Sequence, residues 1–493
     1  MNVAFNPWIP VVTTTGERTL ASLCSVLTEG EKYADLAVRP HERVSLMRLF
    51  LCVAHAALEG PKDYDEWEQV PKELPDAAQN YLEKWKDSFE LFHPTRPWLQ
   101  VAELFGENTS PIALLDFELA TGNNSTLHDH SGQVVTRQIR SAKIVLSLLA
   151  FQNFSSGGGS PVAQWKNTKT RQVGNPDSPC LSQSMAHCLV RGKTLIETIC
   201  LNLPSYETVR RIYKSFSIYK TDKKTKEWAR VEFNDVDFGR PVWEFFPDNP
   251  QSNSHAVINA TKTYLGRLVP VSRWIRLLNQ SEMYCCNGFK YDTFKDGFCA
   301  EPTASVQVVT KKDAKGVETS ERAVVRIDPK KALWRELSAL LIKRSAFGLG
   351  GPLATEYLPY DSEFDFHVCA MTRDQASMDI ALESVFHITP AFHENIATYQ
   401  AEILFAEKIS WRLGNSVEEY RKEIDGSWEK KVEKAKNKWE LKAKLHSLAT
   451  THYWTTIEKN LSLLMAHIEA LGTDEAMPAR EVWRKMLFAT VCD

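Results

Sequence analysis

Residues 454–471 read WTTIEKNLSLLMAHIEAL and carry the clearest structural pattern in the chain. The apolar side chains that define the pattern are Trp454, Ile457, Leu461, Leu464, Ile468 and Leu471. Steps of three and four residues place such side chains on one face of an α-helix. A helix with one apolar face needs a neighbour to cover that face. The stretch therefore predicts a helix packed within a larger helical assembly.

The sequence around this helix changes character near Pro390. Residues 391–493 contain only three glycines and one proline, whereas both residue types are frequent before this point. The three glycines fall between periodic stretches, where helices commonly end. This pattern predicts about four helices packed as an antiparallel bundle.

The longer N-terminal part mixes helical and strand-like patterns. Residues 42–58 have the pattern of a helix, and residues 305–310 and 323–327 have that of two strands joined by a polar turn. We therefore expect an α+β fold. It consists of a large irregular mixed N-terminal domain, residues 1–378, followed by a C-terminal four-helix bundle, residues 379–493.

Composition excludes several classes of protein. The chain has 493 residues, of which 43% are hydrophobic and 25% charged, as in ordinary globular proteins. No apolar stretch reaches the about 18 residues of a membrane span, and the first ten residues lack a signal-peptide pattern, so we expect a soluble cytoplasmic protein. The net charge of −3 argues against a strongly basic nucleic-acid-binding domain, so any such binding has to use local patches or charge from partners.

The ten cysteines are scattered and include no CxxC pair. Structural zinc sites usually rely on such short spacing, and a chain of this length needs no disulfide framework. We therefore expect buried reduced thiols, with no metal and no cofactor.

A glycine run, Ser155-Ser-Gly157-Gly158-Gly159-Ser-Pro161, follows an apolar segment that predicts a helix over residues 141–151. Three successive glycines indicate either a flexible tip or a place where backbone must approach a ligand closely. The run lacks the Lys-Ser/Thr of a phosphate-binding loop and the spacing of a dinucleotide-binding motif, so ATP and NAD are not expected. Both the flexible tip and the ligand loop remain open.

His128, Asp129 and His130 offer the one catalytic hypothesis. Histidine and aspartate ligands around a metal with an open position can activate water, as in a metal-dependent nuclease or phosphohydrolase. Adjacent side chains on an extended segment point to opposite faces, however, so at most two of the three could meet one ion. A hydrogen-bonding loop is the preferred interpretation. Because no nucleophile elbow, Cys/His dyad signature or HExxH motif occurs, we expect no enzyme.

Several short motifs follow one another in a recognisable order. They are 8–11 (WIPV), 93–100 (HPTRPWLQ), 121–130 (TGNNSTLHDH), 151–159 (FQNFSSGGG), 239–243 (GRPVW), 271–277 (VSRWIRL), 301–303 (EPT) and 334–337 (WREL). Together with the C-terminal helices, this order resembles the large subunit of the type I-E CRISPR Cascade complex, the CasA family. The resemblance covers essentially the whole chain.

The resemblance implies a function without catalysis, in antiviral defence. Members of the family recognise the protospacer-adjacent motif in double-stranded DNA, largely from the minor groove, and promote duplex opening and R-loop formation. They also provide a docking surface for the effector helicase-nuclease. The implied partners are the guide RNA-bound Cascade subunits (backbone, small and 5'-handle-binding subunits), the target duplex and the helicase-nuclease, with no membrane. Some relatives carry a zinc knuckle, of which only Cys285 and Cys286 remain here, so zinc is not expected.

The resemblance also assigns candidate DNA-contacting residues. They are Gly157, Gly158, Gly159, Asn123, Asn124, Leu127, Lys290, Lys295, Thr355 and Glu356. The glycines are expected in the minor groove, and the asparagines and leucine in a loop that reaches the guide-RNA end. The two lysines are alternatives for the family's lysine finger. The last two residues are nearest to a hairpin wedge expected over residues 351–360, where this chain has no glutamine. A structural adaptor, whose bundle only joins neighbouring subunits, is the remaining alternative.

Overall fold

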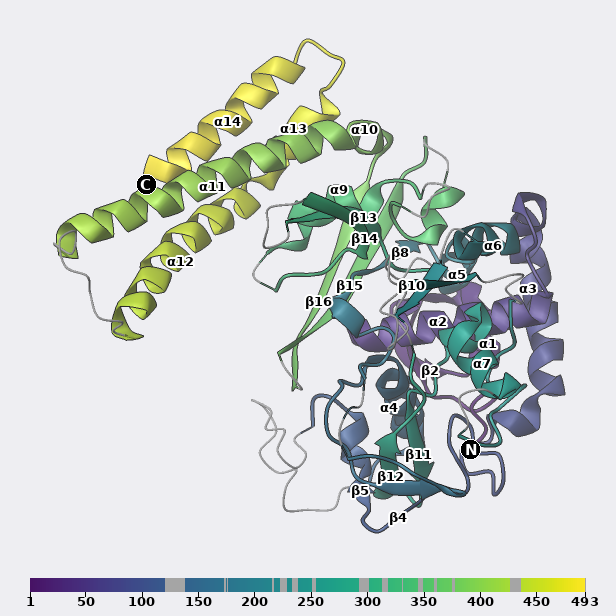
Figure 1. Cartoon of the computed structure of the whole chain (residues 1–493). Helices are drawn as coiled ribbons and strands as arrows, with labels where there is room; N and C mark the ends of the chain where they lie inside the picture. The colour runs from purple at the N-terminus through teal and green to yellow at the C-terminus, as the bar shows by residue number, and fades with distance from the viewer. Residues whose placement is uncertain are drawn as a thin grey trace. The chain divides into compact units, whose positions relative to one another are not determined.

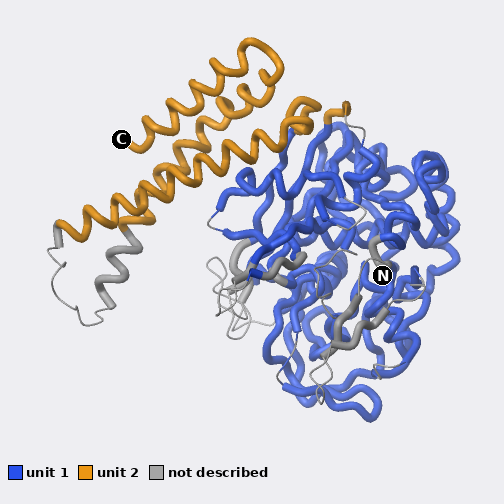
Figure 2. Tube along the Cα trace, turned by 45° about the horizontal axis from the view of Figure 1, so that its top comes forward, with its two compact units in different colours: residues 1–358, 364–387 blue, residues 359–363, 388–493 orange. Residues whose placement is uncertain are grey.

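The computed structural model describes most of the chain (Figure 1). The described residues are 1–119, 138–172, 174, 176–214, 217–221, 228–232, 238–250, 254–291, 301–312, 318–329, 331–344, 349–358, 361–374, 377–425 and 436–492. They form two compact units (Figure 2). Unit 1 consists of residues 1–358 and 364–387, and unit 2 of residues 359–363 and 388–493.

Unit 2 is helical, and the expected C-terminal bundle is confirmed. Its described helices are α10 (Pro390–Glu394), α11 (Ile396–Asp425), α12 (Lys436–Lys459), α13 (Leu461–Glu469) and α14 (Ala476–Cys492). The long helices α11, α12 and α14 pack on one another (Figure 1). Ile457, Leu464 and Ile468 of the apolar stripe are fully buried. The stripe is shared by two helices, because the helix breaks at Asn460 between α12 and α13.

A buried carboxylate links two helices of this bundle. Glu402 of α11 is 0% exposed and accepts hydrogen bonds from Arg480 (2.8 Å) and Arg484 (3.0 Å) of α14. Burial by itself raises the pKa of Glu402, but the two guanidinium groups outweigh this effect and lower it. The ionised carboxylate therefore helps to hold α14 against α11.

The boundary between the units lies later than residue 378. Strand β15 (Phe364–Asp374) pairs on one side with β8 (His187–Arg191) and on the other with β16 (Ser377–Ile388). Because β16 stays in this sheet along its length, unit 1 extends to His387. The sequence pattern placed the boundary at the start of this strand, where apolar alternation and helical periodicity are difficult to separate.

Helix α2 (Pro40–Leu58) is the centre of unit 1. The helix expected over residues 42–58 is thus confirmed, and almost every side chain from His41 to His55 is buried. It packs against α3 (Tyr64–Lys84), α4 (Ser141–Phe154), α8 (Tyr264–Leu268) and β15. A helix buried on all sides lacks a strong amphipathic pattern, which is why its sequence shows little polar face.

Further helices and small sheets surround α2. The helices are α1 (Leu23–Thr28), α5 (Leu195–Leu201), α6 (Tyr206–Lys214), α7 (His255–Lys262) and α9 (Leu337–Leu341). Strands that form small sheets are β1 (Ile9–Thr13), β2 (Arg18–Ala21), β3 (Tyr33–Leu36), β4 (Phe105–Gly106), β5 (Ser110–Pro111), β6 (Ala163–Trp165), β7 (Thr168–Lys169), β9 (Ser217–Thr221), β10 (Trp228–Glu232), β11 (Arg273–Leu277) and β12 (Glu282–Asn287). The orders are β2-β1-β3, β10-β9, β11-β12-β5 and β4-β6-β7.

The expected hairpin is also confirmed, but its second strand begins at Glu318 and not at residue 323. Strand β13 (Val306–Lys312) pairs antiparallel with β14 (Glu318–Val324), with Val306 opposite Val324. Among the described residues, no helix is both long and apolar enough to span a membrane. The fold class expected from the sequence, a mixed α+β part followed by a helical bundle, therefore agrees with the structure.

Candidate nucleic-acid interface

The glycine run begins where helix α4 ends. We call residues 155–160 the glycine loop. Ser155 caps the helix, with its N–H bonded to the Phe151 carbonyl at 3.0 Å. Its hydroxyl is hydrogen-bonded to that of Ser178 at 2.6 Å, and the Ser178 N–H donates to the Ser155 carbonyl at 2.9 Å. The N–H of Gly157 donates to the Asp177 carboxylate at 2.8 Å. The first half of the loop is therefore fixed to residues 177–178.

A buried arginine of β11 supports the same half of the loop. Arg273 is 2% exposed, and its guanidinium donates to the carbonyls of Ser156 (2.8 Å) and Pro176 (2.9 Å). Its backbone N–H donates to the side chain of Gln152 in α4 at 2.9 Å. Burial lowers the pKa of Arg273 to about 10. A buried cation of this kind is costly unless it is hydrogen-bonded, so its contacts with the loop are its compensation.

The second half of the loop is held by a hairpin and by β12. The Ser160 N–H donates to the Gln172 carbonyl at 3.0 Å, and its hydroxyl donates to the side chain of Asn287. Asn287 in turn donates to the Arg171 carbonyl at 2.8 Å. The side chain of Asn287 thus connects the glycine loop, the chain just after β7 and the end of β12.

Aromatic packing fixes this hairpin on the β11–β12 sheet. The ring of Trp165 lies 5.0 Å from that of Trp274 in an edge-to-face arrangement, and 6.1 Å from that of Phe289. Such pairs add to the free energy of burial by about 0.5–1.5 kcal/mol each. The hairpin that leads to Gln172, the hydrogen-bond partner of Ser160, is therefore held by buried side chains.

The tip of the loop presents backbone. Gly157 and Gly158 are partly exposed and Gly159 is exposed. Gly158 has φ of +134°, a conformation that side chains disfavour. The run therefore presents a tip without side chains on a base held by hydrogen bonds.

The structure describes one of the two candidate lysines. Lys290 is exposed and follows β12 by three residues, after Asn287. Lys295 lies outside the described residues. So do Asn123, Asn124 and Leu127, and the metal-ligand candidates His128, Asp129 and His130.

Thr355 and Glu356 are placed differently from the expectation. Residues 353–356 form a 3₁₀ helix, η6 (Leu353–Glu356), so the hairpin expected over residues 351–360 is wrong for the described residues of this stretch. Thr355 is 3% exposed and donates to the Pro352 carbonyl at 2.8 Å. Glu356 forms an ion pair with Arg211 at 2.5 Å. Burial and pairing disfavour direct contact of either side chain with a duplex in this conformation.

A charged network that sequence reasoning missed joins the chain before and after residues 120–137. Arg39, at the start of α2, contacts Asp116 and Glu42, each at 2.6 Å. Lys143 of α4 contacts the same two carboxylates, each at 3.1 Å. Burial raises the pKa of Asp116 and of Glu42, but the Arg39 hydrogen bond and the two cations outweigh it and lower both. The network fixes the chain at both ends of the segment that carries Asn123, Asn124 and Leu127.

Among the described residues, two groups of side chains have the donor types of a metal site. The first contains Cys180, His187 and Glu301. Both ring nitrogens of His187 are already hydrogen-bonded, to the Thr303 hydroxyl (2.8 Å) and the Cys180 carbonyl (2.9 Å), and Glu301 is ion-paired with Arg48. This arrangement is that of an internal hydrogen-bond network.

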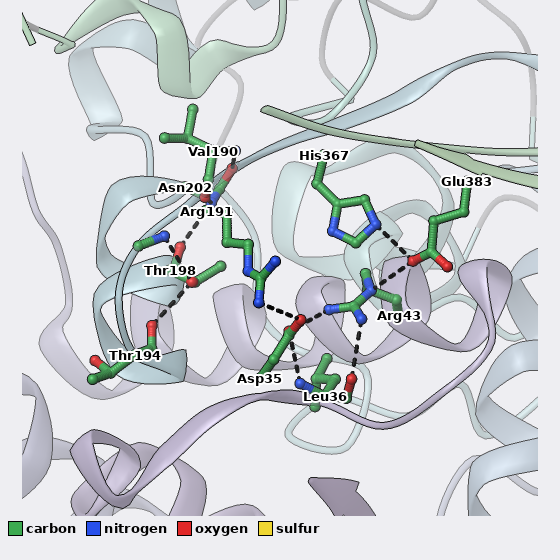
Figure 3. A network of polar contacts seen from close by, with 11 residues as sticks. Asp35, Leu36, Arg43, Val190, Arg191, Thr194, Thr198, Asn202, His367 and Glu383 are labelled. Atoms are coloured by element: carbon green, nitrogen blue, oxygen red, sulfur yellow. Dashed lines mark hydrogen bonds and ion pairs between the residues drawn. The ribbon is translucent and has the colours of Figure 1, made fainter. Parts of the chain in front are cut away.

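The second group contains His367, Cys369 and Glu383, on β15 and β16. Figure 3 shows His367 and Arg43 both directed at the Glu383 carboxylate, at 2.6 and 3.2 Å. Arg43 also contacts Asp35 at 2.5 Å. A guanidinium beside the carboxylate disfavours a divalent cation there, because like charges repel. The network ties the β15–β16 hairpin to α2 and β3.

Comparisons with known proteins agree with these observations. The model of the family described as CRISPR-associated protein Cse1 (CRISPR_cse1) matches residues 2–493. A Thermus thermophilus protein described as CRISPR-associated protein CasA/Cse1 is 26% identical over 510 residues, which cover 99% of this chain and 90% of that protein.

Solved structures share the fold at lower identity. Cse1 from Acidimicrobium ferrooxidans has a TM-score of 0.70 at 18% identity, covering 100% of this chain and 92% of that one. A chain of a CRISPR RNA-guided surveillance complex has a TM-score of 0.72 at 16% identity, covering 99% of this chain and 94% of that one. The resemblance suggested by the colinear motifs is thus confirmed. Since the family model matches nearly every residue, the chain belongs to the CRISPR-associated protein Cse1 (CasA) family.

Proposed function

We propose that this chain is the large subunit of a type I-E CRISPR RNA-guided surveillance complex in the cytoplasm. In this role it recognises the protospacer-adjacent motif in double-stranded DNA, promotes duplex opening and R-loop formation, and offers a docking surface to an effector helicase-nuclease. Membership of the Cse1 family supports the role, as does the likeness of its fold to a chain of a surveillance complex.

The observation that carries the proposal is the glycine loop with its supported base. The minor groove of B-DNA is only about 6 Å wide, so slim backbone enters it more easily than side chains do. Its base edges present mainly acceptors, which backbone N–H groups can contact. The hydrogen bonds of Arg273 and Asn287 hold the loop in place before DNA binds, which lowers the entropy lost on binding.

The weak net charge fits a division of work within the complex. With a net charge of −3, the chain alone gains little from phosphate contacts. Base pairing by the guide RNA reads the target sequence, so this subunit need only read a short tag and start strand separation. Catalysis then belongs to the helicase-nuclease and not to this chain.

The other candidate residues have separate proposed roles. We propose Lys290, or Lys295 in its place, as the lysine finger next to the loop. Asn123, Asn124 and Leu127 remain proposed contacts to the guide-RNA end. Because of its burial, Thr355 is the weakest candidate.

The decisive experiment compares motif-bearing and motif-free duplexes. Their affinities for the guide-RNA complex are measured with and without this chain at one stated salt concentration. We expect a preference for the motif only when the chain is present. Equal affinities in its presence would overturn the proposal, and Mn²⁺-dependent DNA cleavage by the purified chain, lost in His128→Ala, would support the nuclease alternative instead.

A single substitution in the loop sharpens this experiment. An added Cβ at Gly159 would lie 3.5 Å from the Gln172 carbonyl, an ordinary contact, so Gly159→Leu is compatible with the fold. The leucine would nevertheless obstruct entry into the groove. We expect the motif preference to disappear while assembly persists. Asn167→Leu, at the exposed turn between β6 and β7, is the matched control and keeps the preference.

A further inference from the structure

Arg171 lies beside the glycine loop although no motif identifies it. It is exposed and follows β7, the returning strand of the β6–β7 hairpin, by two residues. Its neighbour Gln172 accepts the Ser160 N–H at 3.0 Å, and its own carbonyl accepts the Asn287 amide at 2.8 Å. Two hydrogen bonds thus fix the backbone around Arg171 relative to the loop.

The charge of Arg171 is not compensated within the part of the chain that the structure describes. It forms no ion pair there, whereas nearby Lys169 pairs with Glu107 at 3.7 Å. Lys290, the exposed lysine candidate, also forms no ion pair among the described residues and follows the same Asn287. In a chain with a net charge of −3, these two exposed cations, which are linked along the chain through Asn287, add local positive charge.

We propose that Arg171 binds a backbone phosphate of the target duplex when the glycine loop enters the minor groove. The inference rests on the proposed function, and it adds a positioning contact that carries no sequence information. Phosphates border the groove on both strands, so a cation beside a groove-entering loop meets one of them. Arginine suits this contact because its planar guanidinium can donate two parallel hydrogen bonds to a phosphate.

The test is the salt dependence of duplex binding by the assembled complex. Each phosphate contact contributes about 0.9 to the slope of log affinity against log salt. With Arg171→Gln, we expect the slope to fall by about 0.9 for motif-bearing and motif-free duplexes alike. Equivalently, when salt is raised from 50 to 200 mM, the affinity of the wild type divided by that of the variant should fall by a factor of about 3.5. Arg171→Lys should restore the slope, because it keeps the charge.

The controls separate this inference from the proposed function. Arg18→Gln removes an exposed arginine of β2 and should leave the slope unchanged. A complex that prefers the motif but keeps its slope in Arg171→Gln overturns the role of Arg171 alone. If the wild-type complex shows no preference for the motif, the proposed function is overturned. The change in salt slope between wild type and Arg171→Gln still decides the role of Arg171. If Arg171→Gln changes the salt dependence of assembly on the guide RNA but not that of duplex binding, Arg171 contacts a phosphate of the guide RNA. That result would overturn the proposal.

Discussion

Replacing Arg273 by methionine is expected to release the base of the glycine loop without unfolding the protein. The guanidinium donates to the carbonyls of Ser156 (2.8 Å), Pro176 (2.9 Å) and Ser272 (2.7 Å). Methionine fills a similar volume but donates no hydrogen bond. The guanidinium also donates to the Ser155 carbonyl at 3.3 Å, so four carbonyls would lose this donor.

The cost follows from two opposing terms. A buried carbonyl that loses its partner costs about 1–3 kcal/mol. Against this, burying the Arg273 cation is itself unfavourable, as its lowered pKa indicates, so removing it returns part of the cost. We expect a net loss of about 2–4 kcal/mol. Unit 1 has roughly 380 residues, and at about 2.1 cal/mol/K per residue its Tm should fall by about 3–5 °C.

Calorimetry of the chain and duplex binding by the assembled complex provide the two measurements. We expect the motif preference to fall at least about tenfold, which corresponds to about 1.4 kcal/mol. Arg267→Met is the matched control: Arg267 is 7% exposed and donates to the Thr261 carbonyl at 2.9 Å, away from the loop. It should lower Tm and keep the preference. An Arg273→Met complex with wild-type preference would refute the reasoning, as would an unchanged Tm.

Three further predictions concern pH, the bundle and the loop tip. His41 is 3% exposed with its pKa lowered to about 4 by burial, so the unfolded chain binds its proton first and stability falls from pH 6.5 to 4. We expect the free energy of unfolding of His41→Phe, relative to that of wild type, to rise by about 2 kcal/mol when the pH is lowered from 7.5 to 5. Denaturation at both pH values measures this, and the same difference between variant and wild type at each pH would contradict it. Glu402→Gln leaves Arg480 and Arg484 without an ionised partner and should destabilise unit 2 by about 1.5–3 kcal/mol. Hydrogen exchange in α14 checks this, since unchanged protection would mean that the carboxylate contributes nothing. Gly158→Ala, at φ of +134°, should cost about 1–2 kcal/mol in thermal unfolding, whereas Gly159→Ala should cost less than about 0.5 kcal/mol, and equal costs would exclude backbone strain as the cause.

Local patterns predicted the elements whose stability depends on neighbours in sequence. The apolar stripe of residues 454–471 predicted one packed helix, which the structure divides at Asn460, and the strand pattern near Val306 and Val324 predicted a hairpin. Both patterns have short periods, so a window of a few residues contains them. The glycine run was visible for the same reason, although its conformation was not. Which of its two interpretations applied depended on residues far away.

Tertiary structure alone decided how the candidate site is supported and which candidates face solvent. Arg273 meets Ser156 across 117 residues, Asn287 meets Ser160 across 127, and Arg39 meets Asp116 across 77. No local spacing encodes such contacts, because they form only when separate elements pack together. Burial of Thr355 and exposure of Arg171 are set by the same packing. By itself, then, the sequence determined the helices, the hairpin and the side-chain-free tip, whose signals are periodic or local. The fold determined the support of that tip and the cation beside it, because long-range hydrogen bonds and burial depend on the whole chain.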